Sequence, residues 1–268
     1  MGTRTQEAAA GPRLRVRNSQ GDDDLSKRIH VLTHHEELAA TGSDGVVVVI
    51  DVLFATSTLI TAVDNGAREV LIAETEQEAR ILSRNVKGPV ILGGEKQGKR
   101  LPDFDLGPVP LDYGRDVLFG KAVIYVSTNG TPAMIKAGRT GLPVLLASLR
   151  NAPATARYLG TASDDRDIYL LCSGSRGLLS LEDFVCAGHI AAHLRAWDPE
   201  FYNDAALAAM QVAESRPCLN WVSSGQVGRA LVSHGLEHVV SFCSEIGTTD
   251  TVVALDGRRL VPMGNRER

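Results

Sequence analysis

The chain has 268 residues, of which 44% are hydrophobic and 22% charged, and its formal net charge is -4. This length suits one domain with a sizeable core, and the composition is that of an ordinary soluble globular protein. The weakly acidic balance argues against a nucleic-acid partner, which usually selects a basic face. No apolar run approaches the ~20 residues of a membrane helix, which argues against a membrane protein.

The four cysteines, Cys172, Cys186, Cys218 and Cys243, are not spaced as a zinc site or a disulfide framework, because no CxxC pair occurs. We interpret them as buried free thiols. The N-terminal residues also lack the apolar core of a signal peptide. We therefore expect a cytoplasmic protein.

The first 27 residues are polar and show no apolar period, so we expect a mobile N-terminal tail over 1–27. From 28 to 268 we expect one α/β domain, which could divide into two subdomains. Its first clear element is VVVVID (46–51), a β-branched apolar run typical of a strand buried on both faces.

Short apolar runs then alternate with helical patterns along the chain. Strands are expected at 46–51, 68–73, 89–94, 121–126, 142–148 and 167–173, with helices at 55–66, 75–86, 132–137, 151–159 and 180–194. Residues 202–243 are mostly helical in pattern, and the Asp-Gly pair at 256–257 predicts a hairpin. The alternation predicts an α/β fold with a parallel or mixed sheet, helices on both faces and a helical C-terminal third. Residues 95–120 are expected to form a long loop or a connection between subdomains.

Polar residues gather where the predicted strands end, which is where ligands bind in sheets of this kind. These positions are Asp51 with Thr56 and Ser57, Glu95, the run Ser127, Thr128, Asn129, Gly130 and Thr131, and the run Cys172, Ser173, Gly174, Ser175 and Arg176. In the first of these runs, Thr131 is expected to cap a helix that begins at Pro132. Free N–H groups at that helix start would favour an anion, although a plain capped turn would look the same.

The carboxylates at these strand ends suggest a cation site. Asp51 follows a purely apolar run and would be costly to bury unless it were paired or bound to a metal. With Glu95 and Glu182 it would supply the hard oxygen ligands that Mg²⁺ prefers. Ser180 and Asp183 have capping-box spacing, so Asp183 has a structural explanation, whereas Glu182 could point into a cleft. Singly, each acid could equally be a helix cap or a solvent-facing residue.

These segments together resemble the 2-phosphosulfolactate phosphatase (ComB-like) family. The resemblance rests on seven motifs in order, at 51–58 with 65–67, 93–98, 104–113, 127–131, 150–159, 172–188 and 242–263. It implies a three-layer α/β/α fold and Mg²⁺-dependent hydrolysis of 2-phosphosulfolactate to sulfolactate and phosphate, a step in coenzyme M formation. It also keeps Asp105 in register with the other acids.

The anion-binding positions depart from the family pattern. Phe54 stands where the family has an arginine, Lys96 replaces another arginine, and Pro108 and Val109 alter a third motif. The change at position 54 removes a fork of donors suited to phosphate or sulfonate. The metal and scaffold are therefore expected to persist, while recognition of the substrate has changed.

The sequence predicts a phosphatase that acts on a small phosphorylated acid with Mg²⁺ as cofactor. The predicted catalytic residues are Asp51, Glu182 and Asp183; the substrate-binding residues are Thr56, Ser57, Ser127, Thr128, Asn129, Gly130, Thr131, Cys172, Ser173, Gly174 and Arg176; the metal ligands are Asp51, Glu95 and Asp105. The expected partner is a small anionic substrate, and a homodimer is compatible with the helical C-terminal third. One alternative is an enzyme for a different small acid, as Phe54 suggests. Another is an anion-binding protein without activity.

Overall fold

The computed structural model describes residues 27–162, 166–201 and 203–264. The predicted N-terminal tail lies outside the described residues except for Lys27. None of the helices in the described ranges has the length and apolar character that crossing a membrane requires.

Eleven strands in the described part of the chain form one sheet, in the order β5-β4-β6-β3-β11-β10-β7-β2-β8-β1-β9. Their bounds are β1 Arg28–Leu32, β2 Val46–Ile50, β3 Glu69–Ile72, β4 Val90–Lys96, β5 Lys99–Arg100, β6 Ala122–Val126, β7 Val144–Ala147, β8 Ile168–Cys172, β9 Glu200–Phe201, β10 Val252–Asp256 and β11 Arg259–Met263. The predicted mixed sheet is thus confirmed.

The sheet consists of two parallel sets joined by a hairpin. Strands β4, β6 and β3 pair in parallel, as do β7, β2, β8, β1 and β9. The β10–β11 hairpin pairs antiparallel with β7 on one side and β3 on the other. Three antiparallel pairings therefore separate β3 from β7, so the two sets run in opposite directions along the sheet.

The segments that follow β2 and β6 come together in spite of this reversal. Gly130 begins α4 after β6, and a Cβ added to it would lie 2.4 Å from Oδ2 of Asp51, which follows β2. Two strands that are five steps apart in the sheet order therefore lead to one place.

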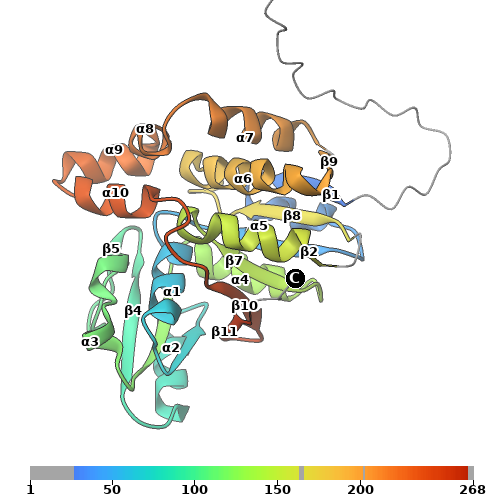
Figure 1. Ribbon diagram of the computed structural model, residues 1–268. Coiled ribbons are helices and arrows are strands. Elements are labelled where there is room, and N and C mark those ends of the chain that lie inside the picture. The colour runs from blue at the N-terminus through green and yellow to red at the C-terminus, as the bar shows by residue number, and fades with distance from the viewer. Residues whose placement is uncertain (1–26, 163–165, 202, 265–268) are drawn as a thin grey trace, which may run out of the picture.

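Helices cover both faces of the sheet (Figure 1). Their bounds are α1 Ala55–Asp64, α2 Glu76–Asn85, α3 Arg115–Leu118, α4 Gly130–Gly138, α5 Ala152–Gly160, α6 Leu181–Leu194, α7 Asp204–Ser215, α8 Cys218–Ser224, α9 Gln226–Ser233 and α10 Glu237–Ser244, with 3-10 helices η1 His35–Ala40, η2 Pro110–Asp112, η3 Leu149–Asn151 and η4 Arg195–Trp197. The three-layer arrangement and the helical C-terminal third are as predicted.

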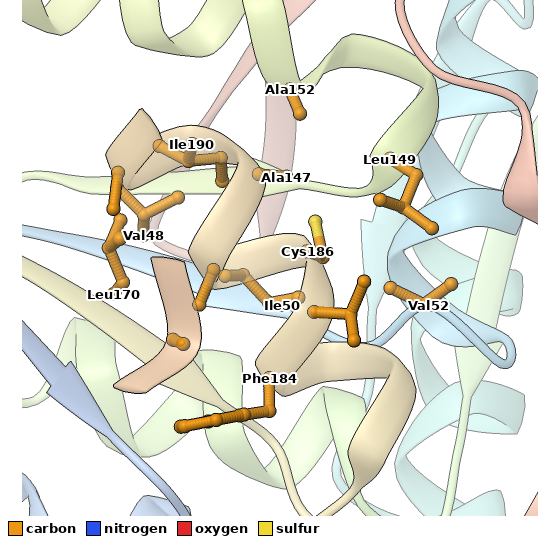
Figure 2. Packing of buried hydrophobic residues seen from close by; sticks show 14 of the residues in the cluster. Val48, Ile50, Val52, Ala147, Leu149, Ala152, Leu170, Phe184, Cys186 and Ile190 are labelled. Atoms are coloured by element: carbon orange, nitrogen blue, oxygen red, sulfur yellow. The ribbon is translucent and has the colours of Figure 1, made fainter. Parts of the chain in front are cut away.

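The side chains of alternate strand residues pack into two separate cores, one on each face of the sheet. Val48, Ile50 and Val52 pack with α5, α6, α8 and α10, and Figure 2 shows them in the same cluster as Phe184 and Cys186 of α6. Val47 and Val49 face the opposite way and pack with α1 and α4. This alternation explains the continuous apolar run of β2, because both of its faces are covered.

The structure differs from the sequence-based prediction at several places. Helix α4 begins at Gly130, two residues before the expected start at Pro132. Strand β1 was not predicted, because its five residues include an arginine and a histidine that interrupt the apolar run. The segment 95–120 holds β5, η2 and α3 rather than a structureless loop.

Helix α6 lies very close to α7 at Gly188. A Cβ added at Gly188 would lie 2.0 Å from the carbonyl oxygen of Ala209. No rotamer change can relieve a clash with backbone, so the two helices would have to separate. Glycine is therefore required here despite its low helix propensity.

We expect Gly188→Ala to lower the free energy of unfolding by about 1–3 kcal/mol, because the clash outweighs the propensity gain. Gly138→Ala is the matched control, since its new Cβ would meet Leu255 at an ordinary 3.6 Å. The control should lie within about 1 kcal/mol of wild type. Denaturant unfolding measures both, and a Gly188→Ala protein as stable as the control would contradict the close packing.

Candidate active site

The carboxyl group of Asp51 lies between the first turns of two helices. Asp51 directly follows β2 and is 8% exposed. Its Oδ1 accepts the Ala55 N–H of α1 at 3.2 Å, and it also accepts the N–H of Gly130 in α4. A Cβ on Gly130 would lie 2.4 Å from Oδ2 of Asp51. Only glycine therefore lets the α4 start approach this carboxyl so closely.

Two further acids reach the same place from the start of α6. Glu182 and Asp183 are almost fully buried. Oδ1 of Asp183 accepts the N–H of Val52 at 2.8 Å, which ties α6 to the turn that follows β2. Ser180 is the N-cap residue as predicted, but its hydroxyl bonds the carboxyl groups of the two acids instead of a helix N–H. The expected capping box is therefore not formed, and Asp183 faces the acid cluster.

Burial holds protons on these acids. Burial, with smaller contributions from Glu95 and Glu182, raises the pKa of Asp51 to about 7 against the stabilising N–H groups of Ala55 and Gly130. Burial also raises the pKa of Glu182. The pKa of Asp183 lies well above its usual range, because burial acts together with repulsion from Asp51 and Glu182. Three uncompensated negative charges at this site would be costly.

No lysine, arginine or histidine in the described ranges forms an ion pair with Asp51, Glu182 or Asp183. The N-termini of α1, α4 and α6 instead meet around the cluster, and helix N-termini favour negative charge. The same property favours a bound phosphate. The site can thus accept an anion or exchange protons.

Glu95 approaches the cluster from the end of β4. Its carboxylate accepts hydrogen bonds from the N–H of Thr128 at 2.5 Å, the hydroxyl of Thr128 at 2.8 Å and the N–H of Gly98 at 2.6 Å. Its charge makes a small contribution to the raised pKa of Asp51, so the two acids lie close enough to repel one another. Asp105 lies apart: it is exposed and accepts the N–H of Leu92 within β4.

Over the described ranges, no three histidine, cysteine or acidic residues are arranged so that they could hold a metal ion by themselves. Any cation at Asp51 and Glu95 would need oxygen ligands from water or substrate.

Most of the predicted hydroxyl ligands hold the local backbone. Thr56 and Ser57 donate to the carbonyls of Asp51 and Val52 at 2.8 Å each, which fixes the turn into α1. Thr131 does not cap α4, whose N-cap residue is Asn129. Its N–H donates to the hydroxyl of Ser127 at 2.9 Å, and its own hydroxyl accepts the N–H of Ser127.

The start of α4 therefore offers fewer free donors than the sequence suggested. The N–H groups of Gly130 and Thr131 are engaged, and Pro132 has none. The predicted proline at the first helical position is wrong, because the helix starts at Gly130 and places Pro132 third.

The turn after β8 forms the other wall of the site. Cys172 is buried and its pKa is well above the usual range because of burial, so the thiol stays protonated. Ser173 is 1% exposed, and its hydroxyl has no hydrogen-bond partner among the described residues. Gly174 has a φ of 73°, which favours glycine. Arg176 is exposed at the tip of the turn.

Sequence reasoning missed a polar group that follows β1. The ring Nδ1 of His35 lies 3.0 Å from the carbonyl oxygen of Ser173. The ring Nδ1 of His34 lies 2.6 Å from the carboxylate of Glu37. The sequence THHEE (33–37), directly after the short apolar run of β1, is the pattern that indicates this group.

Two cavities, of about 290 Å³ and 360 Å³, lie away from these acids. The first is lined by Val46, Val144 and Ile168, the opening residues of β2, β7 and β8, and so lies at the opposite ends of those strands from Asp51. We place the chemistry at the acids, because the titratable groups with shifted pKa values converge there.

The buried acids make a prediction about stability. Each keeps its proton to higher pH in the folded protein than in the unfolded chain, so stability is greatest below the unfolded pKa and falls as pH rises toward the folded one. Asp183→Asn removes this cost while an amide oxygen can still accept the N–H of Val52. We expect its free energy of unfolding relative to wild type to rise by about 1–3 kcal/mol between pH 5 and pH 8.

The control is Asp44→Asn, because Asp44 is exposed and should give a difference that does not depend on pH. Urea unfolding at several pH values measures both variants. A constant difference for Asp183→Asn would show that this acid is ionised in the folded protein across the range.

Comparison with known proteins agrees with the resemblance in the sequence. Residues 31–258 match the family model described as 2-phosphosulpholactate phosphatase. A relative from Carboxydothermus hydrogenoformans is 36% identical over 84% of this chain and 92% of its own length. One from Deinococcus radiodurans is 36% identical over 82% and 91%, and one from Clostridium botulinum (strain Eklund 17B / Type B) is 31% identical over 82% and 92%. All three are named probable 2-phosphosulfolactate phosphatase.

Proposed function

Because the chain belongs to the 2-phosphosulfolactate phosphatase family, a family of phosphoric monoester hydrolases, we propose that it hydrolyses a small phosphorylated acid such as 2-phosphosulfolactate with Mg²⁺ as cofactor. The observation that carries the proposal is the contact between the Asp51 carboxyl and Gly130, which brings an acid of pKa about 7 to the start of α4. A phosphoryl group at this point would meet protonated acids and the positive ends of the helix dipoles.

Asp51 and Glu95 are the residues that would hold the cation. Mg²⁺ is commonly bound by one or two carboxylates, with waters and substrate phosphate oxygens completing six ligands. Two neighbouring acids therefore fit Mg²⁺ without a third protein ligand. Mg²⁺ at these acids would offset their repulsion and polarise the phosphoryl group. Asp105 remains a predicted ligand, although its carboxylate bonds to β4.

The other residues bind the phosphoryl group and supply protons. The raised pKa values of Glu182 and Asp183 favour their protonated carboxyl groups, which can donate hydrogen bonds to phosphate oxygens. In the reaction, water adds to phosphorus and loses a proton, the ester P–O bond breaks, and the alcohol oxygen leaves with a proton from one of these two acids. The proton from the water restores that acid. Ser173 and Asn129 would contact the substrate from either side.

We expect purified protein to release phosphate from 2-phosphosulfolactate only when Mg²⁺ is present. A chelator should stop the release and added Mg²⁺ should restore it. Asp51→Asn should lower kcat at least about 100-fold, because the acid at the centre of the site is lost. Phosphate assays with and without chelator measure these effects.

Asp116→Asn is the control, because Asp116 is an exposed acid on α3 and should keep full activity. Thermal unfolding of both variants establishes that they are folded. Full activity in Asp51→Asn, or phosphate release that is indifferent to the chelator, would contradict the proposal.

Phe54 favours a second candidate, an enzyme of the same family for a different small acid. Phe54 is half-buried and packs against the apolar core beside α6, so it offers no donor to an anion. A pocket with an apolar wall here would suit a less charged substrate than 2-phosphosulfolactate.

The two candidates differ in their response to Phe54→Arg. If 2-phosphosulfolactate is the substrate, wild type hydrolyses it and Phe54→Arg changes kcat/KM by less than about 10-fold, the effect of one good interaction. Activity toward this compound that appears only in Phe54→Arg would instead support the second candidate. Phe54→Leu is the matched control for lost ring volume.

A homodimer and a cytoplasmic location remain predictions from the sequence, and sedimentation of the full chain would measure the first of these.

A further inference from the structure

We propose that His34 binds the second acidic group of the substrate, the carboxylate or sulfonate that the carbon skeleton carries beside the phosphate ester. This inference rests on the proposed function and deepens it. It concerns a residue that follows β1 and lies outside the seven motifs on which the family resemblance rests.

Strand register puts His34 in one row with Asp51. Leu32 pairs with Leu171 of β8, and Ile50 of β2 pairs with Cys172. Extending the register by one or two residues sets His34, Ser173 and Asp51 side by side at the ends of β1, β8 and β2. The N–H of Ser173 donates to the carbonyl of Ile50 at 2.8 Å, so the pairing does continue past β8.

The three side chains also belong to one face of the sheet. Leu32, Leu171 and Val49 share the core that packs on α1 and α4. Side chains in strands alternate between the two faces, so the side chains of the residues two positions later project from that same face. These are His34, Ser173 and Asp51, and the start of α4 contacts Asp51 from this side.

Spacing suits the proposed substrate. Two strand spacings separate His34 from Asp51, about 10 Å between Cα atoms. A phosphorus atom and an acidic group on the neighbouring carbon lie three to four bonds apart, roughly 4–5 Å. With the phosphoryl group at Asp51, the second acid would lie over Ser173 and within reach of the His34 ring.

Ser173 independently indicates a ligand between the two ends of the row. Its hydroxyl is buried, and no described residue hydrogen-bonds it. Buried hydroxyls without a partner are rare, since each costs free energy. A substrate oxygen lying over β8 would satisfy this hydroxyl.

The ring of His34 is held in place. Its Nδ1 lies 2.6 Å from Oε1 of Glu37 and 3.0 Å from the hydroxyl of Thr33, which leaves Nε2 as the ring nitrogen for a ligand. The protonated ring donates from both nitrogens, so Nε2 can then donate to an anion while Nδ1 donates to Glu37. A Cβ on Gly174 would lie 3.3 Å from the Cβ of His34, so the β8 turn lies against it.

The neighbouring His35 has a different role. Its two ring nitrogens contact the carbonyl of Ser173 at 3.0 Å and the carboxylate of Glu36 at 3.2 Å. Glu36 in turn lies 4.0 Å from the ammonium group of Lys136. His35 is therefore a positioning residue that fixes the turn carrying Ser173.

The test compares substrates that differ in the second acidic group. In the presence of Mg²⁺, kcat/KM is measured for 2-phospholactate, which carries a carboxylate, for 2-(phosphonooxy)ethanesulfonate, which carries a sulfonate, and for isopropyl phosphate, which carries neither. The readout is the preference for each acidic substrate over isopropyl phosphate. A purely structural loss lowers all three values together and leaves these preferences unchanged.

We expect His34→Leu to lower at least one preference by about 10-fold or more, the effect of losing a charge-assisted hydrogen bond. The preference that falls identifies the acidic group. His34→Lys should keep most of it, because the lysine ammonium group can also donate a hydrogen bond to an anion. His238→Gln is the control, since His238 is an exposed histidine on α10.

Unchanged preferences in His34→Leu would overturn the role of His34 while leaving the phosphatase proposal intact. An equal loss of substrate preference in His34→Leu and His34→Lys would also overturn the role of His34 and leave the phosphatase proposal intact. No phosphate release by wild type from these compounds or from 2-phosphosulfolactate would overturn the proposed function, and this inference with it.

Discussion

The site depends on one carboxyl group placed between two helix starts. Asp51 accepts the first N–H groups of α1 and α4, and only a glycine at position 130 leaves room for it. Each helix supplies an N–H that would otherwise be unsatisfied at its terminus. The acid thus joins the end of β2 to the loop that follows β6, segments about eighty positions apart in the chain.

The acids around Asp51 oppose stability. Glu182 and Asp183 are buried and have no cationic partner among the described residues, and the charge of Glu182 adds to the cost of ionising Asp183. A core built for stability alone would hold apolar side chains at these positions. Proteins retain such costly groups chiefly at functional sites, where they bind charged ligands or move protons. The family's phosphatase chemistry needs both abilities.

The β10–β11 hairpin gives the sheet its unusual order. It separates the two parallel sets and reverses one relative to the other. The segments that follow β2 and β6 nevertheless meet, because Gly130 lies against the Asp51 carboxyl. Glu95 of β4 adds its charge to the same place from the parallel set that contains β6. The same geometry lets α6 contribute its first turn from the opposite face.

The sequence by itself determined the strand–helix alternation, the terminal hairpin and the acids at the strand ends, because apolar period and turn residues are local properties. It did not determine the start of α4. Ser127 and Thr131 form hydrogen bonds with one another, so Thr131 does not cap the helix and Asn129 is the N-cap residue. It also missed β1 and the two histidines that follow it, because a short strand with two polar residues gains its stability from pairing with β8 and β9, which are distant in the sequence. Which acids share a site was decided by tertiary structure alone: burial and mutual repulsion act through space between residues far apart in the chain.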